Sequence, residues 1–251
     1  MILNLKKYFF LIWIGCFIGS FTVIPFAQTV SILINGKIAE QTTFLLLCVA
    51  AIEGLVYGIL IFLGLKFSQK LGIHLLLLDE NANLKQDLFK PGITIGIICT
   101  VLMLIADRLL PAAHLNLYYI ATHMNPLYGL LGLIPAAFNE EVVVRLFFAF
   151  RYSFVAKKKF FKGLNISTIM WMSVLFTALF FGLGHIATFV HEMTATTPLI
   201  VLRMLVLNGI SGVLFGLLFW RKGFETAMLA HFVSDLLLYV FIPLISSLSI
   251  I

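Results

Sequence analysis

Leu127–Phe150 reads LYGLLGLIPAAFNEEVVVRLFFAF, an apolar run that carries Glu140, Glu141 and Arg145 within it. The run is long enough to cross a bilayer, which takes about 20 apolar residues. A carboxylate at the centre of a membrane helix costs about 2.5–3.5 kcal/mol on insertion scales. Packing alone gives no reason for two adjacent carboxylates at that depth. They are therefore candidate functional residues, and the rest of the chain should supply their partners.

The whole chain is as apolar as this stretch. Of its 251 residues, 61% are hydrophobic and only 11% are charged, whereas about a quarter of a soluble domain is charged. This composition predicts an all-α polytopic membrane protein with one transmembrane domain over residues 1–251 and no sizeable soluble domain. The net charge of +6 indicates Lys and Arg facing lipid headgroups, with no nucleic-acid partner. Three cysteines inside apolar runs indicate neither a disulfide framework nor a metal-binding CxxC.

The hydropathy pattern predicts seven spans, and the short amphipathic stretch Leu71–Leu78 leaves an eighth membrane element open. The seven spans are Tyr8–Ile34, Thr43–Leu65, Pro91–Leu110, Leu127–Phe150, Ile166–Val190, Leu199–Trp220 and Phe224–Leu248. In this arrangement nearly all Lys and Arg outside the spans fall on the side of the N-terminus, and only Lys37 and Arg108 fall on the other side. The positive-inside rule then predicts the N-terminus inside and the C-terminus outside, in a bacterial cytoplasmic membrane.

The charged residues of the fourth span differ in their local partners. Glu141 and Arg145 have i, i+4 spacing with the Glu first, which is the favourable order for a helical ion pair. Glu140 points about 100° away around the helix and has no local partner. We expect Glu141 and Arg145 to form a structural ion pair and Glu140 to act as a general base. One structural cluster of all three charges is the alternative.

Two further spans carry polar residues that can meet this pair. The fifth contains His185, in Phe181-Gly182-Leu183-Gly184-His185. The seventh contains His231 and Asp235, whose i, i+4 spacing places them on one helix face. They can bind a metal, or a water and an oxyanion. A lone histidine in a span is usually structural, but three polar sets on three spans are hard to explain by packing.

These motifs, in this order, resemble those of the CPBP family of intramembrane proteases. The family includes CAAX-prenyl endopeptidases, which trim prenylated proteins, and bacterial members linked to bacteriocin processing or self-immunity. Its pattern Glu-Glu-x-x-x-Arg, Phe-x-x-x-His and His-x-x-x-Asn/Asp is met here by Glu140–Arg145, Phe181–His185 and His231–Asp235. The resemblance covers roughly residues 127–237, within a protease core expected at about 127–248. Asp235 stands where Asn is common, and its charge would favour a cation or a protonated His231.

The resemblance implies hydrolysis of a peptide bond within the bilayer, in a membrane-associated and possibly lipidated peptide or protein. Glu140, helped by His185, would activate a water, and His231 and Asp235 would stabilise the oxyanion. If the family's metalloprotease chemistry applies, a divalent metal such as Zn²⁺ would instead be bound by His185, His231, Glu141 and Asp235. The sequence leaves both mechanisms open, together with the substrate and the oligomeric state.

Other interpretations of the same residues were weighed. The sequence Gly209-Ile210-Ser211-Gly212 is similar to the Gly-x-Ser-Gly of rhomboid proteases and would make Ser211 a nucleophile with His231 as its base. Close helix packing at its glycines is the simpler interpretation. A peptide-binding or immunity protein without catalysis, or a proton or ion transporter, could use the same polar residues. We expect Arg203 to pair with Glu53, to snorkel, or to meet a substrate carboxylate.

A simple count of helix depth argues against a shared site. His185 lies far along the fifth span from its inner end, whereas His231 lies close to the inner end of the seventh. At 1.5 Å per residue the two would sit at different levels of the membrane. A common site requires the helices to tilt or extend unequally, and a separation of the two histidines beyond about 12 Å would exclude it.

Overall fold

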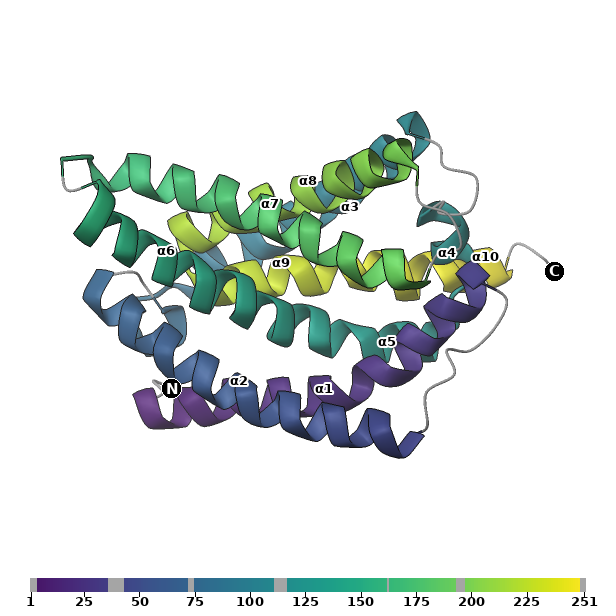
Figure 1. Cartoon of the computed structure of the whole chain (residues 1–251), viewed down its shortest axis with the longest axis horizontal. Coiled ribbons are helices and arrows are strands. Elements are labelled where there is room, and N and C mark those ends of the chain that lie inside the picture. Colours follow the sequence, from purple (N-terminus) through teal and green to yellow (C-terminus); the bar gives the residue numbers. More distant parts are fainter. Residues whose placement is uncertain are drawn as a thin grey trace.

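The computed structural model describes residues 4–35, 43–71, 75–110, 117–161, 163–192 and 197–248, and within these ranges the chain is helical, with no strand (Figure 1). The long helices are α1 (Leu5–Asn35), α2 (Thr43–Leu71), α3 (Lys90–Leu109), α7 (Ile166–Glu192), α8 (Pro198–Lys222) and α9 (Phe224–Leu236). Short helical segments accompany them: η1 (Leu76–Leu78), η2 (Lys85–Phe89), α4 (Leu117–His123), η6 (Leu237–Phe241) and α10 (Ile242–Leu248).

The fourth span is longer than predicted. The segments α5 (Pro126–Pro135), η3 (Ala136–Glu140), η4 (Val142–Ala149), α6 (Phe150–Val155) and η5 (Ala156–Phe160) follow one another as one helix, here called the central helix. It continues to Phe160 and not to Phe150, because no glycine or proline interrupts the chain before Gly163. Pro135, which lacks the N–H of a regular helical turn, precedes the π-helical segment η3. π-Helical turns recur at functional sites, and this one carries Glu140.

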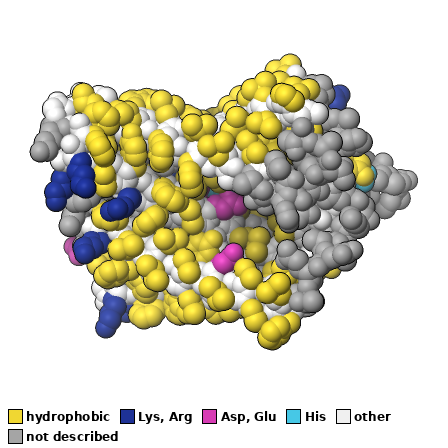
Figure 2. Space-filling model, in the orientation of Figure 1, with side chains coloured by type: hydrophobic (Ala, Val, Ile, Leu, Met, Phe, Trp, Pro, Cys, Tyr) yellow, Lys and Arg dark blue, Asp and Glu magenta, His cyan; other side chains and the backbone are white. Residues whose placement is uncertain are grey.

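The predicted fold class is confirmed. Six helices in the described ranges are long and apolar enough to cross a membrane, and the central helix adds another, which agrees with about seven spans. The two ends of the chain lie at opposite ends of the bundle (Figure 1). Lys and Arg gather at the end where the N-terminus lies (Figure 2). Of the Leu71–Leu78 stretch, residues 72–74 lie outside the described ranges, and Leu76–Leu78 forms the single turn η1.

The central helix is the element against which the others pack. It contacts α1 and α2 on one side and α7 on the other, and its η3 segment packs against α9. Helix α9 in turn packs on α3 and α8. Gly96 makes the α3 contact close, because a Cβ there would lie 2.7 Å from the carbonyl oxygen of Ala230. The polar segments of the central helix, α7 and α9 are thus brought into one layer.

The depth mismatch between the histidines is removed by unequal helix ends. The hairpin of α6 and α7 reaches further toward the basic end of the bundle than the connection between α8 and α9 (Figure 1). A residue far along α7 can therefore sit level with one near the start of α9. The unequal extension of the helices, and not a later start of α7, is what aligns them, since α7 begins at Ile166 as expected.

Close packing of α7 on α8 depends on one glycine and gives a matched test. A Cβ at Gly212 would lie 2.7 Å from the Cα of Ala178, whereas a Cβ at Gly209 would meet nothing within 4 Å. We expect Gly212→Ala to lower the free energy of unfolding by about 1–3 kcal/mol through overpacking. Gly209→Ala should leave stability unchanged or raise it, because alanine is the better helix former. Unfolding of the two variants in detergent checks this, and equal stabilities would contradict it.

Candidate active site

Glu141 lies at the centre of the polar cluster and is fully buried. Its Oε1 is 3.0 Å from Nδ1 of His231, and its Oε2 is 3.4 Å from Nε of Arg145. The carboxylate therefore has a cation on one oxygen and an imidazole on the other. Glu141 is consequently more than half of an ion pair, because it also fixes the orientation of His231.

Arg145 is also fully buried and joins three helices. Its Nη2 donates to the carbonyl of Gly212 on α8 at 3.0 Å, and its Nη1 donates to Oγ1 of Thr177 on α7 at 3.3 Å. Sequence reasoning missed Thr177, although a signal existed: Thr177, Phe181 and His185 follow one another at i, i+4 spacing and share a helix face. The guanidinium thus holds α7 and α8 at fixed positions around the cluster.

His231 presents one ring nitrogen to the site. Its Nδ1 faces the Glu141 carboxylate, which can only accept, so Nδ1 carries the hydrogen and donates. Its Nε2 lies 3.9 Å from Oε2 of Glu140 and 3.8 Å from Oδ2 of Asp235. The ring stacks on Phe215 of α8 with centroids 4.9 Å apart. Phe215 was not predicted, and nothing in its sequence surroundings distinguishes it from other apolar residues of that span.

His185 is oriented in the same way by its own helix. Its Nδ1 is 3.0 Å from the carbonyl oxygen of Phe181, which can only accept, so Nδ1–H donates there. Its Nε2 lies 4.0 Å from Oε2 of Glu140. Both histidines therefore direct Nε2 toward the same carboxylate oxygen.

The predicted site residues meet in one place. Nε2 of His185 and Nε2 of His231 lie 4.0 and 3.9 Å from a single oxygen of Glu140, so they are no more than about 8 Å apart. This is well within the 12 Å limit set by the sequence argument. The side chains of Glu140 and His185 are 36% and 28% exposed, while those of His231 and Glu141 are 7% and 0% exposed. The cluster is thus open on the side of Glu140 and His185.

The arrangement was compared with the metal site that the resemblance implies. No three His, Cys, Asp or Glu side chains in the described ranges are placed to hold a metal ion. Ligand atoms of a tetrahedral zinc, with bonds of about 2.0–2.1 Å, lie about 3.4 Å apart, whereas the atoms around Nε2 of His231 lie 3.8 and 3.9 Å away. Both oxygens of Glu141 already face His231 and Arg145. As arranged, these side chains do not fit a zinc site.

Two other sequence interpretations take their place in the structure. Ser211 is buried and donates to the carbonyl of Asn208 in its own helix at 2.9 Å. The expected pairing of Arg203 with Glu53 is wrong, because buried Arg203 pairs with Asp107. Asp107 also accepts from the backbone N–H of Leu117 at 3.0 Å. The sequence could not show this, since Asp107 lies at the end of its span and reads as an interfacial residue.

The fold and the site together define an integral membrane protein with a carboxylate–histidine centre inside its helix bundle. Residues 122–237, which contain all the site residues, match the family model described as type II CAAX prenyl endopeptidase Rce1-like. The chain carries an Rce1-like domain, which confirms the predicted resemblance to CPBP family proteases. Proteases of this CAAX type act on a peptide or protein substrate within a membrane. No curated protein and no solved structure matches the chain.

Proposed function

We propose that the protein is an intramembrane endopeptidase in which Glu140 activates a water for attack on the scissile carbonyl. The observation that carries this is the position of Glu140, whose Oε2 faces Nε2 of His185 at 4.0 Å and of His231 at 3.9 Å. A water can lie between atoms spaced in this way and make hydrogen bonds of about 2.8 Å to two of them. Glu140 is also the most exposed of the carboxylates in the cluster.

The proposed reaction follows from the direction of each side chain. Glu140 takes a proton from the water as its oxygen attacks the carbonyl carbon, and His185 holds the water in line. The oxyanion that forms accepts a hydrogen bond from Nε2–H of protonated His231, whose charge Asp235 and Glu141 balance. Glu140 then gives its proton to the leaving amine as the peptide C–N bond breaks. Glu141 acts through His231, by holding its ring.

The substrate is proposed to be a membrane-associated peptide, for which a prenylated CAAX protein and a bacteriocin precursor are both candidates. Lys and Arg at the N-terminal end of the bundle (Figure 2) support a topology with that end in the cytoplasm. A bacterial cytoplasmic membrane is the proposed location. An extended segment can reach Glu140 from the open side of the cluster, where His185 is also exposed.

A cleavage assay on the purified full-length protein tests the mechanism. The probe is a farnesylated CAAX peptide, and the products are identified by mass. We expect cleavage by wild type and by Ser211→Ala, and loss of cleavage in His185→Ala and His231→Ala. Loss in Ser211→Ala alone would favour the serine mechanism. Inactivation by a chelator, reversed by added Zn²⁺, would show that a metal takes part. Tight peptide binding by wild type without cleavage would favour a binding or immunity protein.

A further inference from the structure

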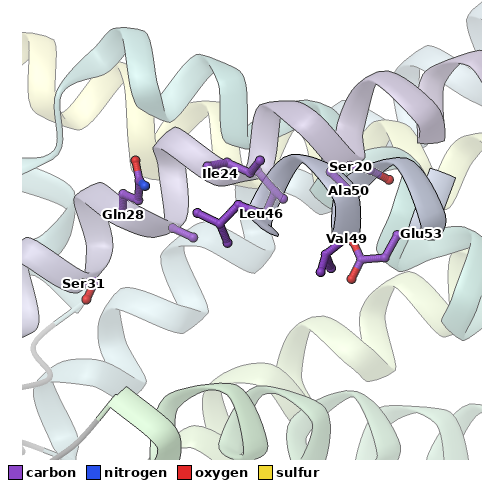
Figure 3. Close-up of a pocket in the computed structure, with 10 residues that line it drawn as sticks. Ser20, Ile24, Gln28, Ser31, Leu46, Val49, Ala50 and Glu53 are labelled. Carbon is purple, nitrogen blue, oxygen red and sulfur yellow. The ribbon is translucent and has the colours of Figure 1, made fainter. Parts of the chain in front are cut away.

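A second polar feature lies outside the catalytic cluster, in a pocket of about 210 Å³ between α1 and α2 (Figure 3). Ser20, Ile24, Gln28 and Ser31 line it from one face of α1, and Leu46, Val49, Ala50 and Glu53 line it from α2. The spacing of three or four residues within each set places these side chains on facing stripes of the two helices. The pocket therefore combines apolar walls with one carboxylate.

Glu53 has no partner that explains its position. It lies ten residues after Thr43, the first residue of α2, and so about 15 Å along the helix, near mid-membrane for a hydrocarbon layer of about 30 Å. Its side chain is exposed, and no Lys, Arg or His in the described ranges forms an ion pair with it. Acidic side chains appear within this otherwise apolar face of the molecule (Figure 2). Ionisable residues at this depth mark functional sites and generally have an opposite charge nearby.

The pocket is continuous with the catalytic cluster. Ser20 lines the pocket and accepts a hydrogen bond of 3.3 Å from Nδ2 of Asn139, the residue before Glu140. Tyr57, one helical turn from Glu53, lies next to Asn139 and within electrostatic range of both Glu53 and Glu140. Polar side chains thus lead from Glu53 to the catalytic carboxylate. A peptide bound at Glu140 can extend into this pocket.

We propose that the pocket is a substrate subsite in which Glu53 binds the cationic end of a Lys or Arg side chain of the peptide. This rests on the proposed function, because the subsite serves the peptide that Glu140 cleaves. The apolar walls formed by Ile24, Leu46 and Val49 suit the methylene stem of such a side chain, and the carboxylate suits its charged end. In low-dielectric surroundings the attraction between opposite charges is strong, so the subsite selects basic over neutral side chains.

The test uses pairs of farnesylated CAAX peptides that differ only in Lys or norleucine at one position. The position is moved along the segment on each side of the cleaved bond. For at least one position, wild type should cleave the Lys peptide with a kcat/KM about tenfold higher than the norleucine peptide, the effect of a modest ion pair. Glu53→Gln should lose this preference with unchanged kcat/KM for the norleucine peptide. Glu80→Gln, which removes an exposed loop carboxylate, should keep it.

A binding arm separates this proposal from the proposed function. The same peptides are titrated into the Glu140→Gln and the Glu140→Gln, Glu53→Gln proteins, and Kd is measured by fluorescence anisotropy. A Lys preference that only the first protein shows supports the subsite even if wild type cleaves nothing. The subsite is wrong if wild type shows no Lys preference at any position, or if Glu53→Gln keeps it. It is equally wrong if that variant loses both peptides alike.

Discussion

Glu140→Gln is expected to lower kcat by about 10²–10⁴-fold while the free energy of unfolding stays unchanged. A general base contributes acceleration of this size, and glutamine keeps the shape of the side chain but cannot take the proton from water. Stability should be kept because the Glu140 side chain is 36% exposed and its closest ion-pair contacts, to His185 and His231, are 3.9–4.0 Å long. The measurement is kcat on a farnesylated peptide together with chemical unfolding in detergent.

Asp235→Asn is the matched control for Glu140→Gln. It also converts one carboxylate of the cluster to an amide, at a position where the family pattern accepts Asn. Its kcat should remain within about tenfold of wild type, since Asp235 stands beside Nε2 of His231 at 3.8 Å and does not exchange a proton with substrate. Equal losses in the two variants would show that any change of charge in the cluster inactivates the protein. Unfolding of Glu140→Gln would make Glu140 a structural residue.

The fold and most of the site follow from local sequence features. Apolar runs of membrane length locate the spans, because hydropathy alone decides which segments stay in lipid. The i, i+4 spacing of Glu141 and Arg145 indicates their contact, because helical periodicity fixes which side chains are neighbours. Polar residues on three apolar helices point inward, since lipid does not solvate them. These inferences need no knowledge of tertiary structure.

Contacts between helices far apart in sequence could not be obtained in this way. Arg203 was paired with the wrong acid, because the choice between Glu53 and Asp107 depends on how α8 is placed relative to α2 and α3. The role of Glu141 in orienting His231 was missed for the same reason. The spacing of residues around one helix shows a partner on that helix but not one on another. Phe215 has no local signature, and its stacking on His231 depends on the rotation of α8.

The end of the central helix was missed for a different reason. Hydropathy places the boundary at Phe150, where Arg151 and then Lys157–Lys159 begin, because charge marks the edge of the hydrocarbon. A helix does not end where lipid ends, however, since its backbone hydrogen bonds continue until a residue breaks them. The extension to Phe160 lets the α6–α7 hairpin project and removes the apparent depth difference between His185 and His231.

Arg145→Met is expected to destabilise the protein by about 3–5 kcal/mol, the usual result of removing one partner of a buried ion pair. The remaining Glu141 carboxylate would be fully buried and would keep only His231 as a partner. Hydrogen bonds to Gly212 and Thr177 would be lost as well, which loosens α7 and α8. Chemical unfolding in detergent measures the effect. A loss below about 1 kcal/mol, the value typical of an exposed pair, would contradict the buried pair.

The double variant Arg145→Met, Glu141→Gln separates the two roles of Glu141. Removing both charges leaves no unpaired ion, so most of the lost stability should return relative to Arg145→Met alone. Activity should not return, because glutamine cannot supply the negative charge that balances a protonated His231. A double variant that is stable but inactive would show that Glu141 serves catalysis through His231. Recovery of both properties would leave Glu141 with the ion pair as its only role.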